Sequence, residues 1–194
     1  TARQPKLRVA AIQIDPINMG SEQSLRGRSL AVHERVDLIC WPESSLGIYC
    51  DDLTHFRDRK QTIRLSIDSH HCLEPAVGFA CPLLAGGKAY RPGASQEGPF
   101  AMTAFLIDGD QEIVGRYRKR TLLPFGEYIP GQQWWPAVRE WATLRDVVEA
   151  GNDARPLTMV AGHRLGLVIC YEDTLPPNAR KTVAAGAEAL FSII

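Results

Sequence analysis

The chain alternates short apolar runs with polar segments, and most of the runs are as long as a buried strand. β-branched and aromatic residues are frequent in them, and proline, glycine or aspartate residues close several of them. The pattern predicts strands over Leu7–Ile14, Asp37–Trp41, Ala76–Leu84, Phe100–Ile107, Glu112–Tyr117, Thr158–Val160, Arg164–Cys170 and Ala189–Ile194.

Helical segments are predicted between several of these strands. Ser21 is a residue type that caps helices, and the apolar positions after it indicate a helix to about Val36. Pro176-Pro177 begins a second helix, which Gly186 ends. The segments Leu53–His71 and Gln132–Glu149 are also predicted to be helical.

Turn signals complete the fold prediction. Asp108-Gly109-Asp110 and Ala161-Gly162-His163 each join two predicted strands and indicate hairpins. Gly86-Gly87-Lys88 lacks the glycine spacing of a phosphate-binding loop and predicts a simple turn. Strands that alternate with helices early, followed by hairpins, favour a mixed α/β layered fold over a doubly wound sheet.

Composition narrows the class of protein. The 194 residues, of which 45% are hydrophobic and 23% charged, suit one globular domain over residues 1–194. Lys and Arg number 22, as do Asp and Glu, so the neutral chain excludes a nucleic-acid partner held by bulk charge. No apolar run reaches the roughly 18 residues of a membrane span. The cysteines do not form a disulfide framework in a chain of this length: Cys40, Cys50, Cys72, Cys81 and Cys170.

Both ends of the sequence suggest a piece of a longer polypeptide. The chain begins with Thr1 and not with methionine, and the apolar run Ala189–Ile194 predicts a buried strand with nothing after it to cover it. We therefore expect a layered domain that is truncated at its C-terminus.

The sequence offers weak signals for other sites. His70-His71-Cys72 lacks the spacing of metal ligands and predicts a solvated helix end. We expect no metal and no organic cofactor. Trp134-Trp135 and Trp141 are expected to lie in the core or in a lid, with contact to an acyl chain or a membrane surface as the alternative.

Cys170 is the first candidate for chemistry. It ends the apolar run Arg164–Cys170 and precedes a polar turn, so a strand would deliver the thiol to a crevice on a rigid support. The alternative is a small hydrophobic residue that finishes a buried strand.

Glu43 is the second candidate. The run Asp37–Trp41, followed by Pro42, brings this carboxylate to the tip of another buried strand. Desolvation at such a position raises a carboxyl pKa, which suits a general base near neutral pH. The alternative is a cap of a turn or helix.

Lys119 is the third candidate, within a strand of alternating basic residues. Arg116, Arg118 and Arg120 share one face of that strand, and Lys119 shares the other with Tyr117. If the arginine face is solvated, Lys119 points inward and needs an anionic partner or a function.

Together, these three residues could run nucleophilic catalysis. The Glu43 carboxylate would take the Cys170 proton, the sulfur would attack a carbonyl carbon, and the Lys119 ammonium would stabilise the developing negative charge.

Three segments resemble the motif blocks of the nitrilase (carbon–nitrogen hydrolase) superfamily, in the expected order. They are Leu38-Ile-Cys-Trp-Pro-Glu43, Tyr117-Arg-Lys119 followed by Leu122-Leu-Pro-Phe-Gly-Glu-Tyr-Ile-Pro130, and Gly166-Leu-Val-Ile-Cys-Tyr-Glu172. The second and third blocks resemble the apolipoprotein N-acyltransferase branch in particular.

The resemblance implies a four-layer α-β-β-α sandwich with Glu43 as general base, Lys119 as oxyanion-stabilising cation and Cys170 as nucleophile. It also implies that Glu127 positions Lys119 or the intermediate, and that Tyr171 and Glu172 support the site. In that branch a phospholipid donates its acyl chain to the cysteine, and the thioester passes to the N-terminal amine of a lipoprotein.

The resemblance also implies a location and partners. The domain would lie on the periplasmic face of a bacterial inner membrane, with membrane contact through helices that this chain lacks. The alternatives are a soluble, cytoplasmic amidase in which water accepts the acyl group, and a non-catalytic relative of the kind associated with conjugal transfer. The sequence does not determine the oligomeric state, and a homo-oligomer is one possibility.

Overall fold

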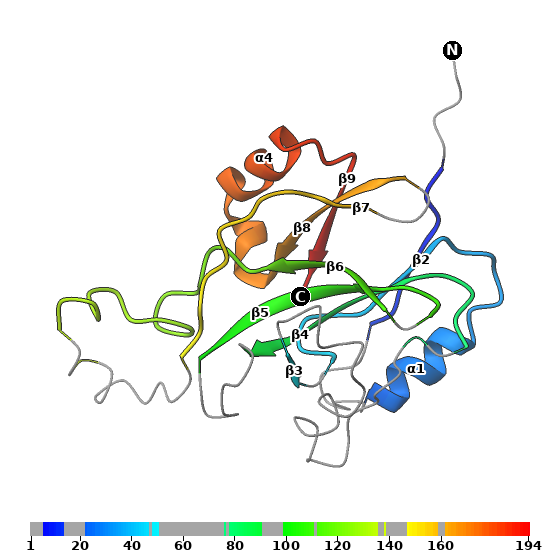
Figure 1. Ribbon diagram of the computed structural model, residues 1–194, viewed down its shortest axis with the longest axis horizontal. Helices are drawn as coiled ribbons and strands as arrows, with labels where there is room; N and C mark the ends of the chain where they lie inside the picture. Colours follow the sequence, from blue (N-terminus) through cyan, green and yellow to red (C-terminus); the bar gives the residue numbers. More distant parts are fainter. Residues whose placement is uncertain are drawn as a thin grey trace.

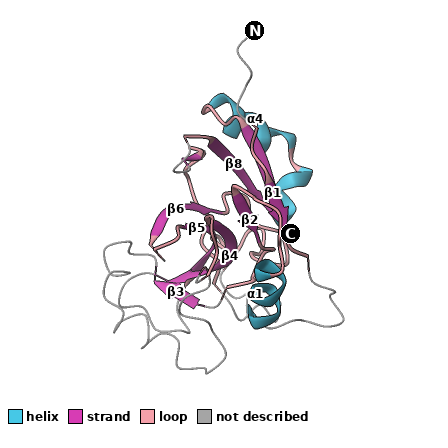
Figure 2. Cartoon of the chain, turned by 90° about the vertical axis from the view of Figure 1, so that its right-hand side faces the viewer, coloured by secondary structure: helices cyan, strands magenta, loops and turns pink. Residues whose placement is uncertain are grey.

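Two β-sheets face each other, and a helix covers the outer face of each (Figures 1 and 2). The computed structural model describes residues 6–13, 22–46, 48–50, 76, 78–90, 99–110, 112–135, 138, 147–158 and 162–194. Helix α1 (Glu22–Leu30) lies on the larger sheet and helix α4 (Pro176–Ala184) on the smaller one. The layers therefore follow the order α-β-β-α, as the resemblance implies.

The larger sheet has six strands, and its topology places the carboxyl ends of two of them at one edge. Strands β1, β2 and β4 are parallel, whereas β5 is antiparallel to β4 and β6 is antiparallel to β5. As a result β2 and β6 run in the same direction, although β4 and β5 separate them. The bounds are β1 (Val9–Ala11), β2 (Leu38–Cys40), β3 (Ile48–Cys50), β4 (Leu83–Tyr90), β5 (Phe100–Ile107) and β6 (Ile113–Arg118).

The smaller sheet contains β7 (Leu157–Thr158), β8 (Arg164–Ile169) and β9 (Ala189–Ile193). Strands β8 and β9 are parallel and are joined through a 3-10 turn and α4. α4 packs closely on β8 because Gly166 has no side chain: a Cβ there would lie 2.6 Å from Cγ2 of Thr182.

The inner faces of both sheets form one core. Residues of β4, β5 and β6 meet residues of β8 and β9 there, and Leu84, Leu106, Leu165 and Leu167 are almost fully buried. A second core lies between α1 and the outer face of the larger sheet, where Trp41 donates a hydrogen bond from Nε1 to Oγ of Ser29 at 2.9 Å. Apolar burial on both faces of the larger sheet explains the continuous apolar runs of its inner strands.

Most of the predicted strands and both predicted hairpins are confirmed. β5 and β6 pair through the turn at Asp108, whose Oδ1 accepts hydrogen bonds from the backbone N–H groups of Asp110 and Glu112. β7 and β8 pair in the antiparallel sense. The helix after Pro176 and the last strand also lie where the sequence placed them.

The predicted helix from Ser21 to Val36 is too long. α1 ends at Leu30, because backbone bonds from Ala31 to Arg28 and from Val32 to Ser29 tighten the chain into an i→i−3 turn. The Gln132–Glu149 helix is wrong at its described ends, since residues 132–134 form turns and Val148 forms a bridge to Phe100, whereas Val138 is helical.

The strand predicted over Ala76–Leu84 starts later, and the turn predicted at Gly86-Gly87-Lys88 lies inside β4. Ala76 and Phe79 are buried, but they lie before the strand, in a turn. The Phe79 ring lies 6.2 Å from the Trp41 ring, measured between their centroids. Predictions for Leu53–His71, including His70-His71-Cys72, and for Trp141 fall outside the described residues. In the part of the chain that the structure describes, no helix is long and apolar enough to cross a bilayer.

Candidate active site

Glu43 follows β2 in a short excursion of the chain over β4. β2 pairs with β4 up to Leu84, and β3 pairs with β4 again from Lys88 onward. Between these two pairings the chain leaves the edge of β4 and carries Glu43 above it. The carboxylate is therefore held by a loop that is tied to a strand on both sides.

Lys119 directly follows β6 and is buried, with 1% of its surface exposed. Its Nζ lies 2.6 Å from Oε1 of Glu127 and 3.7 Å from Oε1 of Glu43. A buried ammonium requires such anionic partners, because an isolated charge is costly to remove from water. The inward orientation predicted for Lys119 is confirmed, and so is that of Tyr117, which is 3% exposed.

Cys170 directly follows β8 and is partly exposed. Its thiol lies beside the Glu43 carboxylate, which acts on the pKa of that thiol. Burial raises the pKa of Cys170, and the Glu43 charge and hydrogen bond add to this rise, against the opposing Lys119 ammonium and a backbone hydrogen bond at Tyr171. The sulfur therefore rests as a thiol beside a base, and it becomes a nucleophile when that base takes the proton.

Backbone strain is concentrated around these residues. Among the described residues, three that are not glycine adopt a positive φ: Ser44 at 55°, Phe125 at 63° and Cys170 at 49°. Ser44 adjoins Glu43, and Phe125 lies in the loop of Glu127. Non-glycine residues in this region are rare and gather at functional sites, where the surrounding structure holds them.

Glu127 joins the site through the loop after Lys119. One carboxylate oxygen contacts the Lys119 ammonium, and the other accepts a hydrogen bond from the backbone N–H of Leu123 at 2.7 Å. The loop therefore closes on its own carboxylate, which fixes the position of the ammonium.

Glu172 is fully buried and lies behind the reacting groups. Its Oε1 accepts hydrogen bonds from the backbone N–H groups of Arg120 and Thr121 at 2.7 and 3.0 Å. Its Oε2 accepts from the backbone N–H of Ile169 at 3.0 Å and from the Tyr117 hydroxyl at 2.9 Å. One carboxylate thus ties the segment after Lys119 to the end of β8, next to Cys170. Tyr171 is half-buried, and its backbone acts to lower the pKa of the Cys170 thiol.

Arg120 differs from its predicted place on the solvated face of the strand. Strand β6 ends at Arg118, so the alternation of faces no longer applies at Arg120. Its guanidinium donates hydrogen bonds to the Tyr117 hydroxyl at 2.9 Å and to the Thr182 hydroxyl at 2.8 Å, which links the site to α4. No local pattern predicts this role, because it depends on contacts with a distant helix.

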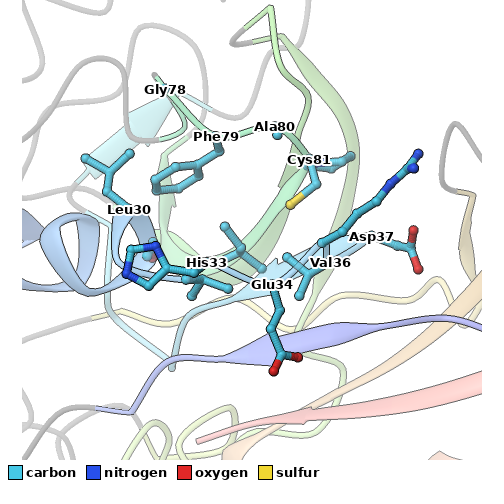
Figure 3. Close-up of a pocket in the computed structure, with 14 residues that line it drawn as sticks. Leu30, His33, Glu34, Val36, Asp37, Gly78, Phe79, Ala80 and Cys81 are labelled. Carbon is cyan, nitrogen blue, oxygen red and sulfur yellow. The ribbon is translucent and has the colours of Figure 1, made fainter.

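The structure contains a cavity of about 740 Å³ that lies away from these groups (Figure 3). It lies at the opposite ends of β2 and β4, between the end of α1 and residues 78–82, and His33, Phe79 and Cys81 are among its lining residues. None of Glu43, Lys119, Glu127 and Cys170 lines it. The chemistry is therefore assigned from the converging side chains and not from this cavity.

Comparison with known proteins agrees with the geometry. Residues 8–194 match the family model described as carbon-nitrogen hydrolase. The chain belongs to the carbon–nitrogen hydrolase family. The resemblance to the nitrilase superfamily is thereby confirmed, and the proteins similar to this chain include enzymes named as acyltransferases and amidases.

Solved structures of carbon–nitrogen hydrolases share the fold. A carbon–nitrogen hydrolase from Helicobacter pylori G27 is similar with a TM-score of 0.59 and 18% identity, over 96% of this chain and 59% of that one. An amidase from Nesterenkonia sp. is similar with a TM-score of 0.60 and 19% identity, over 98% of this chain and 65% of that one. The predicted fold class is confirmed.

In sequence, the chain is similar to the apolipoprotein N-acyltransferase of Geobacter metallireducens. It is 26% identical over 198 residues, a match that covers 96% of this chain and 35% of that protein. The apolipoprotein N-acyltransferase of Chlorobaculum tepidum is 27% identical over 218 residues, a match that covers 96% of this chain and 39% of that protein. The chain thus spans little more than a third of these relatives.

Proposed function

We propose that the protein is a cysteine-dependent acyltransferase that forms a thioester on Cys170 and passes the acyl group to an amine. The observation that carries the proposal is the contact set of one buried ammonium, two carboxylates and one thiol. Lys119 contacts both Glu43 and Glu127, and the Glu43 carboxylate raises the pKa of the Cys170 thiol beside it.

In the first half-reaction Glu43 acts as the general base. Its carboxylate takes the Cys170 proton while the sulfur bonds to the carbonyl carbon of the donor, and the carbonyl electron pair moves to the oxygen. The Lys119 ammonium stabilises that oxyanion. When the intermediate collapses, the bond to the leaving group breaks, and the leaving group takes the proton from Glu43. The product is a thioester on Cys170.

In the second half-reaction Glu43 takes a proton from the attacking amine, which bonds to the thioester carbon. The oxyanion forms again beside Lys119, and its collapse breaks the carbon–sulfur bond. The departing sulfur takes the proton from Glu43, which restores the thiol. Glu127 holds the ammonium in place in both steps.

A phospholipid is the proposed acyl donor, and an exposed aromatic group supports it. Phe125, Trp134 and Trp135 are 74%, 83% and 58% exposed, on the segment that also carries Glu127. Of the two positions expected for these tryptophans, the core is therefore wrong, and their exposure is compatible with a lid. Aromatic side chains of this kind suit the boundary between water and lipid, so this segment would meet an acyl chain or a membrane surface.

The N-terminal amine of a lipoprotein is the proposed acceptor, at the periplasmic face of a bacterial inner membrane. The sequence relatives named apolipoprotein N-acyltransferase support it. An amidase is the second candidate, supported by the Nesterenkonia structures. One of these structures, of a mutant of that amidase, shows covalent addition of the acetamide moiety of fluoroacetamide at the active-site cysteine. An amidase would use the same residues with water as the acceptor.

The acceptor distinguishes the two activities. The protein is incubated with phospholipid vesicles and a synthetic diacylglyceryl lipopeptide, and the products are separated by mass spectrometry. An N-acylated lipopeptide that disappears with Cys170→Ala supports the transferase. Free fatty acid with unmodified lipopeptide favours the hydrolase, and products that persist with Cys170→Ala contradict both.

A further inference from the structure

Gly86 lies in the middle of β4, directly beneath the excursion that carries Glu43. Its backbone N–H donates to the carbonyl of Pro42 at 3.3 Å, and its carbonyl accepts from the backbone N–H of Leu46 at 2.8 Å. The Ser45 hydroxyl donates to the same carbonyl at 3.3 Å. The residues before and after Glu43 are therefore both bonded to this one glycine.

The excursion crosses Gly86 so closely that a side chain has no space there. A Cβ on Gly86 would lie 2.8 Å from Cα of Glu43 and 3.1 Å from the backbone nitrogen of Ser44. Both contacts involve backbone atoms, so a change of side-chain rotamer cannot relieve them. Ser44 already holds a positive φ of 55°, which leaves the loop little freedom to yield.

We propose that Gly86 is a positioning residue that sets the distance of the Glu43 carboxylate from Cys170 and Lys119. The proposal concerns the placement of Glu43, and it rests on the proposed function only for its consequence in catalysis. A glycine within a strand interior marks a close backbone approach, and here the approaching backbone is that of the acidic residue.

The contact predicts a measurable effect of any larger residue at this position. Gly86→Ala must displace the backbone of Glu43, and the carboxylate then moves away from Cys170. The Glu43 charge helps to raise the pKa of Cys170. Displacement of the Glu43 carboxylate therefore lowers that pKa, and the thiolate forms at lower pH. Alkylation by iodoacetamide reports this directly, since the thiolate is the reacting species.

The test measures the rate of Cys170 alkylation against pH for wild type, Gly86→Ala and Glu43→Gln, with peptide mass spectrometry as the readout. Gly115→Ala is the matched control in β6 of the same sheet, since the three atoms nearest to a Cβ there are side-chain atoms of Leu157 and Leu106, the closest at 3.1 Å. We expect Gly86→Ala and Glu43→Gln to shift the profile to lower pH. A shift of about one pH unit raises the rate at pH 7 about tenfold.

A Gly86→Ala profile that coincides with wild type and Gly115→Ala would overturn the proposal. If the single variant does not fold, Ser44→Gly in the same chain gives the loop freedom to yield, and the double variant must show the same shift. Failure of both to fold also overturns the proposal, because Gly86 would then serve the sheet as a whole. The assay needs no substrate, so a failure of the proposed acyl transfer leaves its result unaffected.

Discussion

The Nζ atom of Lys119 lies 3.7 Å from Oε1 of Glu43, although their strands are not neighbours in the sheet. The two residues meet because β2 and β6 run in the same direction and end at the same edge. Cys170 follows the end of a strand in the facing sheet and completes the set. The site thus forms because the carboxyl ends of β2, β6 and β8 lie close together.

Replacing Lys119 is expected to impair both activity and stability. Lys119→Met leaves Glu43 and Glu127 without their buried cation, so the free energy of unfolding should fall by about 3–5 kcal/mol. Lys119→Arg keeps the charge, but a planar guanidinium does not fit a point-charge site, and turnover should fall by about 10²–10³-fold. Urea unfolding and initial rates measure the two effects, and near-normal turnover of Lys119→Arg would remove Lys119 from the mechanism.

Glu43→Gln is expected to separate thiol reactivity from catalysis. The variant loses the carboxylate that helps to raise the pKa of Cys170, so alkylation at neutral pH should become faster. Turnover should nevertheless fall by about 10²–10⁴-fold, because the general base is gone. Both rates are measured on the same preparation, and a parallel rise in alkylation and turnover would show that Glu43 is not the base.

Residues at strand ends were the easiest to predict from sequence. Glu43, Lys119 and Cys170 each follow an apolar or alternating run, and such runs indicate where a strand stops. Glu127 lies in a loop whose path no periodicity encodes, so it was named through the family resemblance alone. The structure brings Lys119 into contact with both Glu43 and Glu127, and it places Cys170 where the Glu43 and Lys119 charges act on its thiol.

Glu172→Gln is expected to destabilise the protein through its hydrogen bonds. Both carboxylate oxygens accept from N–H or O–H donors, so an amide NH₂ must face a donor on one side. The cost should be about 1–3 kcal/mol, and a chain of this size loses about 2–4 °C of Tm for each kcal/mol. Asp173→Asn is the matched control on the exposed side of the same turn. Equal Tm values for the two variants would contradict the role given to Glu172.

The Cys40 thiol is expected to make the free energy of unfolding fall as the pH rises in the alkaline range. Burial, with a smaller contribution from Cys81, raises the pKa of Cys40 from 9.0 to about 12. An acid with a raised pKa in the folded state stabilises the protein fully below its unfolded pKa, and this contribution is lost as pH rises toward the folded value. At about pH 10.5 the loss should be about 2 kcal/mol.

Cys40→Ala tests this directly by urea unfolding at pH 7 and at about pH 10.5. The variant should lose less stability between the two pH values than the wild type does. Identical losses would show that the Cys40 thiol does not titrate with unfolding in this range.

Contacts between distant segments limited the sequence predictions. Arg120 follows the alternation of its neighbours, but its side chain turns toward α4 once β6 ends at Arg118. Gly86 was assigned to a turn, because composition does not show that another segment crosses the strand at that point. In both cases tertiary contact decides the role, and a local pattern does not contain it.

Trapping the acyl group on Cys170 tests the central claim most directly. The protein is mixed with an acyl donor, quenched in acid, and mapped by peptide mass spectrometry beside Cys170→Ala. A thioester mass on the peptide of Cys170, absent from the peptides of Cys40 and Cys81 and from the variant, is the expected result. No adduct on Cys170 under conditions in which product forms would contradict a covalent cysteine mechanism.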